Sequence, residues 1–180
     1  MDAGILLAIQ ENLRHPLWTP WVVAITSLNN GGILSILACV LILAFRRTRR
    51  VGVVASASLA ASAALVNLTI KPLTARIRPY EVIEGLELLV HPQSDFSFPS
   101  GHTSAAFAVA VVMLRLLPRR YGVPALVLAV LIALSRLYVG VHYPTDVLAG
   151  AVIGSTVALI ACHVGRKWIA YPERGLSMKR

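Results

Sequence analysis

The sequence predicts an all-α fold, a polytopic transmembrane helix bundle of about five to six spans with an N-terminal interfacial helix. Three observations favour this class. Of the 180 residues, 57% are hydrophobic and only 14% are charged, whereas a soluble domain carries about a quarter charged residues. The apolar residues form long runs, each about the length of a helix that crosses a bilayer core of ~30 Å. Basic residues gather near the ends of these runs. We therefore expect one integral-membrane domain over residues 1–180.

The expected elements follow the apolar runs in chain order. Residues 4–13 mix apolar and polar positions and predict a helix in the membrane interface, inside an interfacial or dipping segment over 1–30. The expected spans lie at 21–45, 51–70, 101–117, 123–141 and 146–165. The sequence NNGG at 29–32 interrupts the first run, which favours a short dipping helix followed by a span that begins near Gly31.

The basic residues predict the orientation of the bundle. In a chain this apolar, membrane topology explains the net charge of +9 better than nucleic-acid binding does, so no nucleic-acid partner is expected. Twelve of the seventeen basic residues fall on one side, within 46–50 and at Arg115, Arg119, Arg120, Arg166, Lys167, Arg174, Lys179 and Arg180. The positive-inside rule places this side in the cytoplasm of a cell membrane, so residues 71–100 and 142–146 face outward.

Small residues predict how the helices pack. Gly150 and Gly154 form a GxxxG pattern, which lets helix backbones approach closely in lipid. We favour packing within one chain over dimerisation, because a multi-span chain must pack internally; the oligomeric state is left open. Cys39 and Cys162 lack the spacing of a zinc site or a disulfide framework, and we expect both to pack as small buried hydrophobes.

Three polar clusters share the outward side of the predicted bundle. They lie at 71–79, 99–102 and 135–146. Lys71 and Arg78 belong to the first cluster and Arg136 to the third, and charges at membrane depth normally mark function. Three cations at one site favour an anion, and phosphate fits because Arg offers a planar fork and Lys a point charge. For Arg14 and Arg76 we expect side chains that extend to lipid headgroups instead.

The second and third clusters add the groups that could carry out chemistry. Ser100 is placed to cap a helix whose first turn holds Gly101 and His102, and a helix start of this kind binds anions. Asp146, in the first turn of the last expected helix, can reach one ring nitrogen of His142. The other nitrogen would then be free to act as a nucleophile.

The pattern K-x6-RP, PSGH and SR-x5-H-x3-D resembles the type 2 phosphatidic acid phosphatase superfamily of integral-membrane lipid phosphate phosphatases. The matched positions are Lys71, Arg78, Pro79, Pro99, Ser100, Gly101, His102, Ser135, Arg136, His142 and Asp146. The resemblance implies that His142 attacks phosphorus, that Asp146 orients it and that His102 protonates the leaving oxygen. It also implies a phosphate site that needs no metal or cofactor and is formed by Lys71, Arg78, Ser100, Gly101 and Arg136.

The motifs specify the reaction more closely than they specify the substrate. Similarity to small bacterial undecaprenyl-diphosphate phosphatases implies hydrolysis of that carrier lipid on the extracytoplasmic face. Phosphatidylglycerol phosphate and phosphatidic acid remain alternatives. A vanadium-dependent haloperoxidase shares the same anion pocket, but the membrane spans and the lack of a large soluble helical domain argue against it. A non-catalytic lipid-binding membrane protein would give no reason for paired histidines with an orienting acid.

Overall fold

The computed structural model describes residues 2–169, and every regular element within that range is a helix. Four helices are short or irregular: η1 (Asn30–Gly32), the π-helix η2 (Ala64–Ile70), α5 (Lys71–Thr74) and α6 (Pro79–Val82). The longer ones are α1 (Asp2–Leu13), α2 (Thr19–Leu28), α3 (Ile33–Ala44), α4 (Arg49–Ala63), α7 (Gly101–Leu116), α8 (Arg119–Tyr138) and α9 (Pro144–Ile169). The prediction of an all-α bundle is confirmed.

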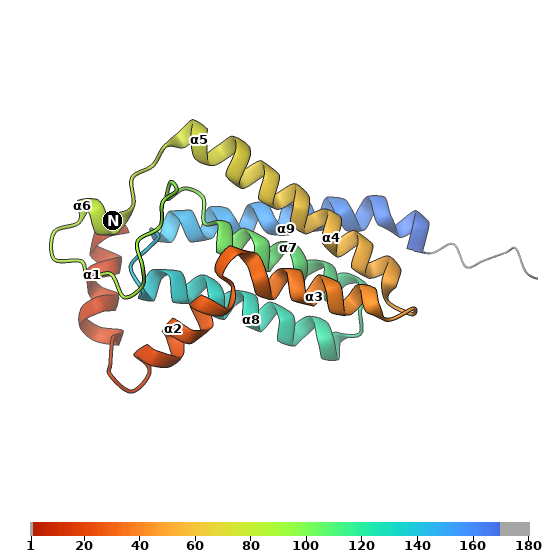
Figure 1. Ribbon diagram of the computed structural model, residues 1–180, viewed down its shortest axis with the longest axis horizontal. Coiled ribbons are helices and arrows are strands. Elements are labelled where there is room, and N and C mark those ends of the chain that lie inside the picture. The colour runs from red at the N-terminus through yellow and green to blue at the C-terminus, as the bar shows by residue number, and fades with distance from the viewer. Residues whose placement is uncertain (1, 170–180) are drawn as a thin grey trace, which may run out of the picture.

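Helix α7 lies at the centre of the bundle. Its residues Val109 and Val112 belong to a buried cluster with side chains of α3, α4 and α9, whereas Ala106 and Ala110 belong to a second cluster with α8. Figure 1 shows these helices running side by side along the longest axis, with α1 across one end. Packing on two faces holds α7 in place, so the start of this helix is a firm base for the residues around it.

The contact between α7 and α9 depends on the two glycines of the GxxxG pattern. A Cβ atom at Gly150 would lie 2.6 Å from the carbonyl oxygen of Ser100, and one at Gly154 would overlap the carbonyl oxygen of Ser104. The pattern therefore serves packing within the chain, as predicted. Cys39 and Cys162 are buried and form no disulfide, and both belong to the cluster formed by α3, α4, α7 and α9, also as predicted.

By length and composition, the helices that the structure describes offer fewer candidate spans than the five to six that were expected. Within residues 2–169, three helical stretches are long and apolar enough to cross a membrane, namely Arg49–Val82, Arg119–Tyr138 and Pro144–Arg166. A bent pair, Thr19–Leu28 with Asn30–Ala44, makes a fourth if it counts as one broken span. The remaining apolar run forms α7, whose 16 residues are short for a span. Five to six spans are therefore not confirmed.

The break between α2 and α3 lies where the sequence predicts it. Gly31 and Gly32 adopt φ values of 60° and 75°, which suit glycine. The buried Asn29 side chain donates to the backbone carbonyl of His102 at 3.2 Å and accepts from the Ser35 hydroxyl at 3.2 Å. This amide satisfies polar groups at the break and also ties it to the first turn of α7.

The two ends of the bundle differ in charge. The turn between α3 and α4, the turn between α7 and α8 and the far end of α9 lie at one end, opposite the loop between α6 and α7 (Figure 1). The described part of the predicted cytoplasmic basic group therefore lies at one end. Arg174, Lys179 and Arg180 of that group fall outside the described residues, as does the side chain of Lys167.

Candidate active site

The first wall of the site comes from the segment after α4. The helix widens into the seven-residue π-helix η2, continues as α5 and ends at Ala75, whose φ is 44°. π-helical turns are frequent at functional sites, because the extra residue re-aims the side chains that follow. Lys71 and Arg78 emerge from this segment with exposures of 4% and 2%. Cations this well buried require anionic or polar partners.

The second wall is the start of α7, which is capped as predicted. The Ser100 hydroxyl accepts from the backbone N–H of Thr103 at 3.4 Å, and the Ser100 N–H donates to the carbonyl of Asp146 at 3.0 Å. A Cβ atom at Gly101 would lie 3.7 Å from Lys71 Nζ. The helix start and an ammonium group therefore face the same space, which favours an anion there.

The third wall is the turn between α8 and α9, which holds His142 and Asp146. Both side chains are buried, and His142 Nδ1 lies 3.4 Å from Asp146 Oδ2. This separation is longer than a normal hydrogen bond. Asp146 Oδ2 also accepts from the Ser97 hydroxyl at 2.5 Å and from the Tyr143 N–H at 2.9 Å. The carboxylate is therefore held beside the ring by groups other than the histidine.

The surroundings of His142 favour the neutral form of its imidazole at physiological pH. Burial lowers the pKa of its imidazole to about 4, and the charges of Arg78 and Arg136 act in the same direction, whereas Asp146 opposes the shift. A neutral ring with Nδ1 towards the carboxylate leaves the lone pair of Nε2 available. This is the state that a nucleophilic histidine requires.

Arg136 has donors that the protein does not use. Its side chain is 1% exposed, and Nη1 donates to the Thr26 hydroxyl at 2.6 Å. Nε and Nη2 have no hydrogen-bond partner within residues 2–169. Leaving two donors of a buried guanidinium unsatisfied is costly, and an anionic ligand would satisfy both.

The structure brings all of the predicted site residues to one end of the bundle. His102 is near enough to interact electrostatically with Arg136, His142, Lys71 and Arg78, and its Nε2 lies 3.2 Å from Asn30 Oδ1. Three cations and two imidazoles thus lie within electrostatic range of one another at this end. The arrangement can bind a phosphate group, attack it from one side and exchange a proton with it on another.

Two cavities border this group of residues. One has a volume of about 440 Å³ and is lined by Lys71, Gly101 and His102 together with apolar Ile36, Leu59 and Ala105 from α3, α4 and α7. The other, of about 450 Å³, is lined by Arg136 and by residues of α2 and the segment 88–93. The first cavity therefore joins a polar end, suited to phosphate, to an apolar wall suited to a hydrocarbon chain.

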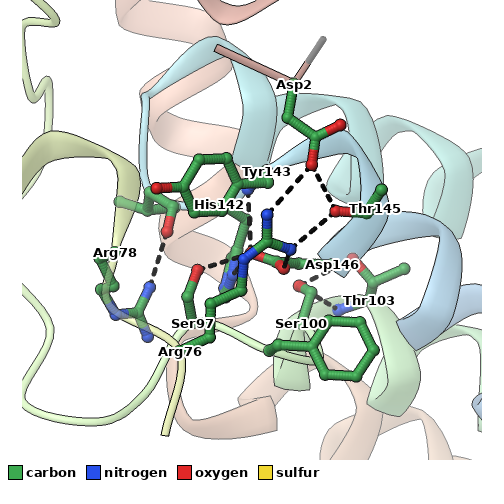
Figure 2. A network of polar contacts seen from close by, with 12 residues as sticks. Asp2, Arg76, Arg78, Ser97, Ser100, Thr103, His142, Tyr143, Thr145 and Asp146 are labelled. Atoms are coloured by element: carbon green, nitrogen blue, oxygen red, sulfur yellow. Dashed lines mark hydrogen bonds and ion pairs between the residues drawn. The ribbon is translucent and has the colours of Figure 1, made fainter. Parts of the chain in front are cut away.

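The predicted role of Arg76 is wrong. Its Nη1 donates to Asp146 Oδ1 at 2.6 Å and its Nη2 to Asp2 Oδ2 at 3.1 Å, and the guanidinium lies 3.9 Å above the Tyr143 ring (Figure 2). Arg76 therefore holds the carboxylate beside His142 rather than reaching for lipid headgroups, because a buried carboxylate attracts the cation more strongly.

The predicted role of Arg14 is wrong for a similar reason. Its Nε donates to the carbonyl of Tyr138 at 3.0 Å, and its Nη1 donates to the amide oxygen Oε1 of Gln10, also at 3.0 Å. These bonds direct the guanidinium into the end of the bundle, where they connect the segment after α1 to the end of α8. Arg14 therefore ties the N-terminal helix to the helix that carries Arg136.

Asp2, Asp95 and Ser97 are site residues that sequence reasoning missed. Ser97 bonds Asp146, and Asp2 pairs with Arg76. Asp95 forms ion pairs with both Lys71 and Arg78. Burial opposes ionisation of Asp95, but the hydrogen bonds and charges of Lys71 and Arg78 outweigh it and hold the pKa of that carboxyl below its usual value. None of these residues belongs to a motif with a recognisable spacing.

Potential metal ligands are not clustered in the part of the chain that the structure describes. No group of three or more His, Cys, Asp or Glu side chains in residues 2–169 is placed to hold a metal ion. The fixed cations Lys71, Arg78 and Arg136 are the positive charges that the site offers to a phosphate. Independence from metals stays a prediction.

Comparison with known proteins agrees with this geometry. A relative named undecaprenyl-diphosphatase, from Sulfolobus acidocaldarius, is 34% identical over 124 residues, which are 69% of this chain and 60% of the relative. A relative named decaprenylphosphoryl-5-phosphoribose phosphatase, from Mycobacterium tuberculosis, is 39% identical over 131 residues, which are 72% of this chain and 70% of the relative. The chain thus matches 60% to 70% of the length of these two curated relatives.

A solved structure and a family model extend the comparison to the fold. The crystal structure of a transmembrane PAP2-type phosphatidylglycerolphosphate phosphatase from Bacillus subtilis superposes with a TM-score of 0.75 at 29% identity, covering 92% of this chain and 85% of that one. The family model of the PAP2 superfamily matches residues 50–170, the stretch that contains every motif residue described above. The chain belongs to the PAP2 superfamily.

Proposed function

We propose that this protein is an integral-membrane lipid phosphate phosphatase that releases a terminal phosphate through a phosphohistidine, with undecaprenyl diphosphate as the leading candidate substrate. One observation carries the proposal. Lys71, Arg78, Arg136 and His142 all lie within electrostatic range of His102, and two buried donors of Arg136 have no partner in residues 2–169. A phosphate group satisfies these donors and neutralises the cations.

The first step is transfer of the phosphoryl group to His142. Nε2 attacks phosphorus and forms a P–N bond while the bond from phosphorus to the lipid-side oxygen breaks. His102 donates a proton to that departing oxygen. Burial and the nearby cations lower the pKa of His102 to about 2, so the negative charge of the bound phosphate has to hold this proton on the ring. Asp146, 3.4 Å from Nδ1, stabilises the positive charge that develops on the ring of His142. The cations and the N–H groups at the start of α7 stabilise the negative charge on the equatorial oxygens.

The second step is hydrolysis of the phosphohistidine. His102, now neutral, accepts a proton from water, and the water oxygen attacks phosphorus as the P–N bond breaks. Inorganic phosphate and the neutral imidazole of His142 are restored together. The cavity of about 450 Å³ beside Arg136 supports access for water and release of phosphate, because polar His91 and Gln93 are among the residues that line it.

The choice of substrate rests on the first cavity and on the relatives. Apolar side chains at Ile36, Leu59 and Ala105 continue from the phosphate end towards the middle of the bundle, which supports a substrate with a hydrocarbon chain. A prenyl diphosphate is supported by the name of the Sulfolobus acidocaldarius relative. Phosphatidylglycerol phosphate is the second candidate, supported by the superposition on the Bacillus subtilis enzyme over 92% of this chain.

The site is proposed to face the outside of the cell membrane. In support, the turns that contain the basic sequence at 46–50 and the residues Arg119 and Arg120 lie at the end of the bundle opposite the site. Basic residues accumulate on the cytoplasmic side of membrane proteins. The substrate would then be hydrolysed on the extracytoplasmic face.

A panel assay tests the proposal. Purified protein in detergent micelles is given undecaprenyl diphosphate, phosphatidylglycerol phosphate or phosphatidic acid, and phosphate release is compared through kcat/KM. We expect the prenyl diphosphate to be the best substrate and His142→Ala to release no phosphate from any of them. Release that persists in His142→Ala, or is absent from the unmodified protein with every lipid phosphate, would contradict the proposal.

A further inference from the structure

The carboxylate of Asp95 bridges two of the three cations of the site. Its Oδ2 is paired with Lys71 Nζ, and its Oδ1 accepts from Arg78 Nη2 at 2.5 Å. Lys71 and Arg78 belong to the segment before the loop, whereas Asp95 lies in the loop that leads to α7. A carboxylate that accepts from an ammonium and a guanidinium makes the same kind of contacts as two oxygens of a phosphate.

Asp95 also borders the cavity into which the substrate must come. Lys71, Gly101 and His102 line that cavity with it. The side chain of Asp95 is 51% exposed, in contrast to the 6% and 3% of the side chains of Lys71 and Arg78. The carboxylate can therefore turn towards solvent, where water replaces its lost partners, while the two cations stay buried.

The backbone around Asp95 is held independently of its carboxylate. Arg78 Nε donates to the carbonyl oxygen of Asp95 at 2.8 Å, and the N–H of Ser97 donates to the carbonyl oxygen of Arg76 at 2.8 Å. Rotation about the side-chain bonds of Asp95 breaks neither bond. Departure of the carboxylate thus requires no rearrangement of the loop.

We propose that Asp95 is an internal competitor of phosphate, which pairs with Lys71 and Arg78 between turnovers and must leave them when the substrate binds. The inference rests on the proposed function, because it assigns the same two cations to the substrate phosphate. Asp95 weakens the binding of substrate and product alike. By returning to the cations as phosphate departs, it speeds release of a product that three buried cations would otherwise retain.

A purely structural role for Asp95 makes the opposite prediction. If the carboxylate served only to aim Lys71 and Arg78 at the phosphate, its removal would misplace both cations and weaken phosphate binding. If it competes with phosphate, its removal frees both donors and tightens binding. The sign of the change in phosphate affinity therefore decides between the two roles.

The test compares Asp95→Asn with the unmodified protein and with Glu84→Gln. Asparagine keeps the shape of the side chain and removes its charge, and the control removes one negative charge from an exposed position in the same loop. Competitive inhibition by orthophosphate is measured with the lipid substrate in micelles. We expect the inhibition constant to fall by roughly fivefold to tenfold in Asp95→Asn, as for loss of two partly exposed charge pairs, and to be unchanged in Glu84→Gln.

A second readout needs no turnover. The rise in melting temperature caused by orthophosphate reports binding directly, and we expect it to be larger in Asp95→Asn and in Asp95→Ala than in the unmodified protein. Asp95→Glu keeps a competing carboxylate and should bind orthophosphate as the unmodified protein does. Equal or weaker orthophosphate binding in both uncharged variants overturns the inference. If the unmodified protein binds orthophosphate but hydrolyses no lipid phosphate, the proposed function is contradicted instead.

Discussion

Substitution of Arg76 by alanine tests whether the catalytic carboxylate depends on a residue outside the family motifs. Arg76 Nη1 lies 2.6 Å from Asp146 Oδ1, and no other hydrogen bond to that oxygen is formed within residues 2–169. The Asp146 side chain is fully buried. Removal of Arg76 therefore leaves a buried carboxylate oxygen without a donor, although Ser97 and Tyr143 still bind Oδ2.

The size of the effect follows from this geometry. An unsatisfied buried acceptor costs about 1–3 kcal/mol, and Arg76 is one-third exposed, so water can replace part of the lost interaction. If the correctly oriented pair of His142 and Asp146 loses about 2 kcal/mol of stabilisation, kcat falls roughly 30-fold. The KM should change much less, because Arg76 is not among the residues assigned to the phosphate.

The assay is phosphate release from the best lipid substrate, with kcat and KM determined separately and the folded fraction checked by thermal melting. Arg76→Lys, which keeps a cation, should recover part of the lost kcat. Arg119→Ala, at an exposed position at the other end of the bundle, is the matched control and should behave as the unmodified protein. A kcat within twofold of the unmodified value in Arg76→Ala would refute the reasoning.

Four further predictions concern the mechanism and the topology. His142→Ala should lower phosphate release by at least about 10³-fold with no loss of folded protein, and turnover close to the unmodified rate would rule out His142 as the nucleophile. Because burial lowers the pKa of His142 to about 4, the acid limb of kcat/KM, where the nucleophile becomes protonated, should lie near that value; an acid limb near the ordinary histidine pKa of about 6.5 would contradict this. Activity should survive EDTA, and a complete loss that added metal reverses would show a metal requirement. A cysteine in place of Glu84 should react with a membrane-impermeant thiol reagent added to intact cells, whereas protection would invert the proposed orientation.

Several parts of the fold could be predicted because their causes are local. The break at 29–32 follows from two glycines that adopt positive φ values there. The start of α7 follows from Ser100, whose hydroxyl caps the helix. The number of spans could not be predicted as well, because an apolar run such as α7 has the composition of a span whether it is surrounded by lipid or by other helices.

The residues of the site likewise divide into those that could be predicted from the sequence and those that could not. Lys71, Arg78 and Arg136 could be selected because a charge in an apolar chain needs a compensating partner, whichever segments supply it. The partners of Asp146 and Lys71 could not be selected in this way. Asp95 lies 24 positions from Lys71 and Arg76 lies 70 positions from Asp146 along the chain, and polar residues in loops have no periodicity that relates them.

Sequence alone therefore specifies the chemical class of this protein. Its apolar runs predict membrane helices, and its short motifs contain the cations that suit phosphate and the two histidines with an acid. The folded arrangement decides which carboxylate each cation meets. It directs Arg76 to Asp146 and Asp95 to Lys71 and Arg78. The physical reason is that a motif depends on neighbours a few residues away, whereas a buried ion pair depends on which segments the packing of α4, α7 and α9 brings together.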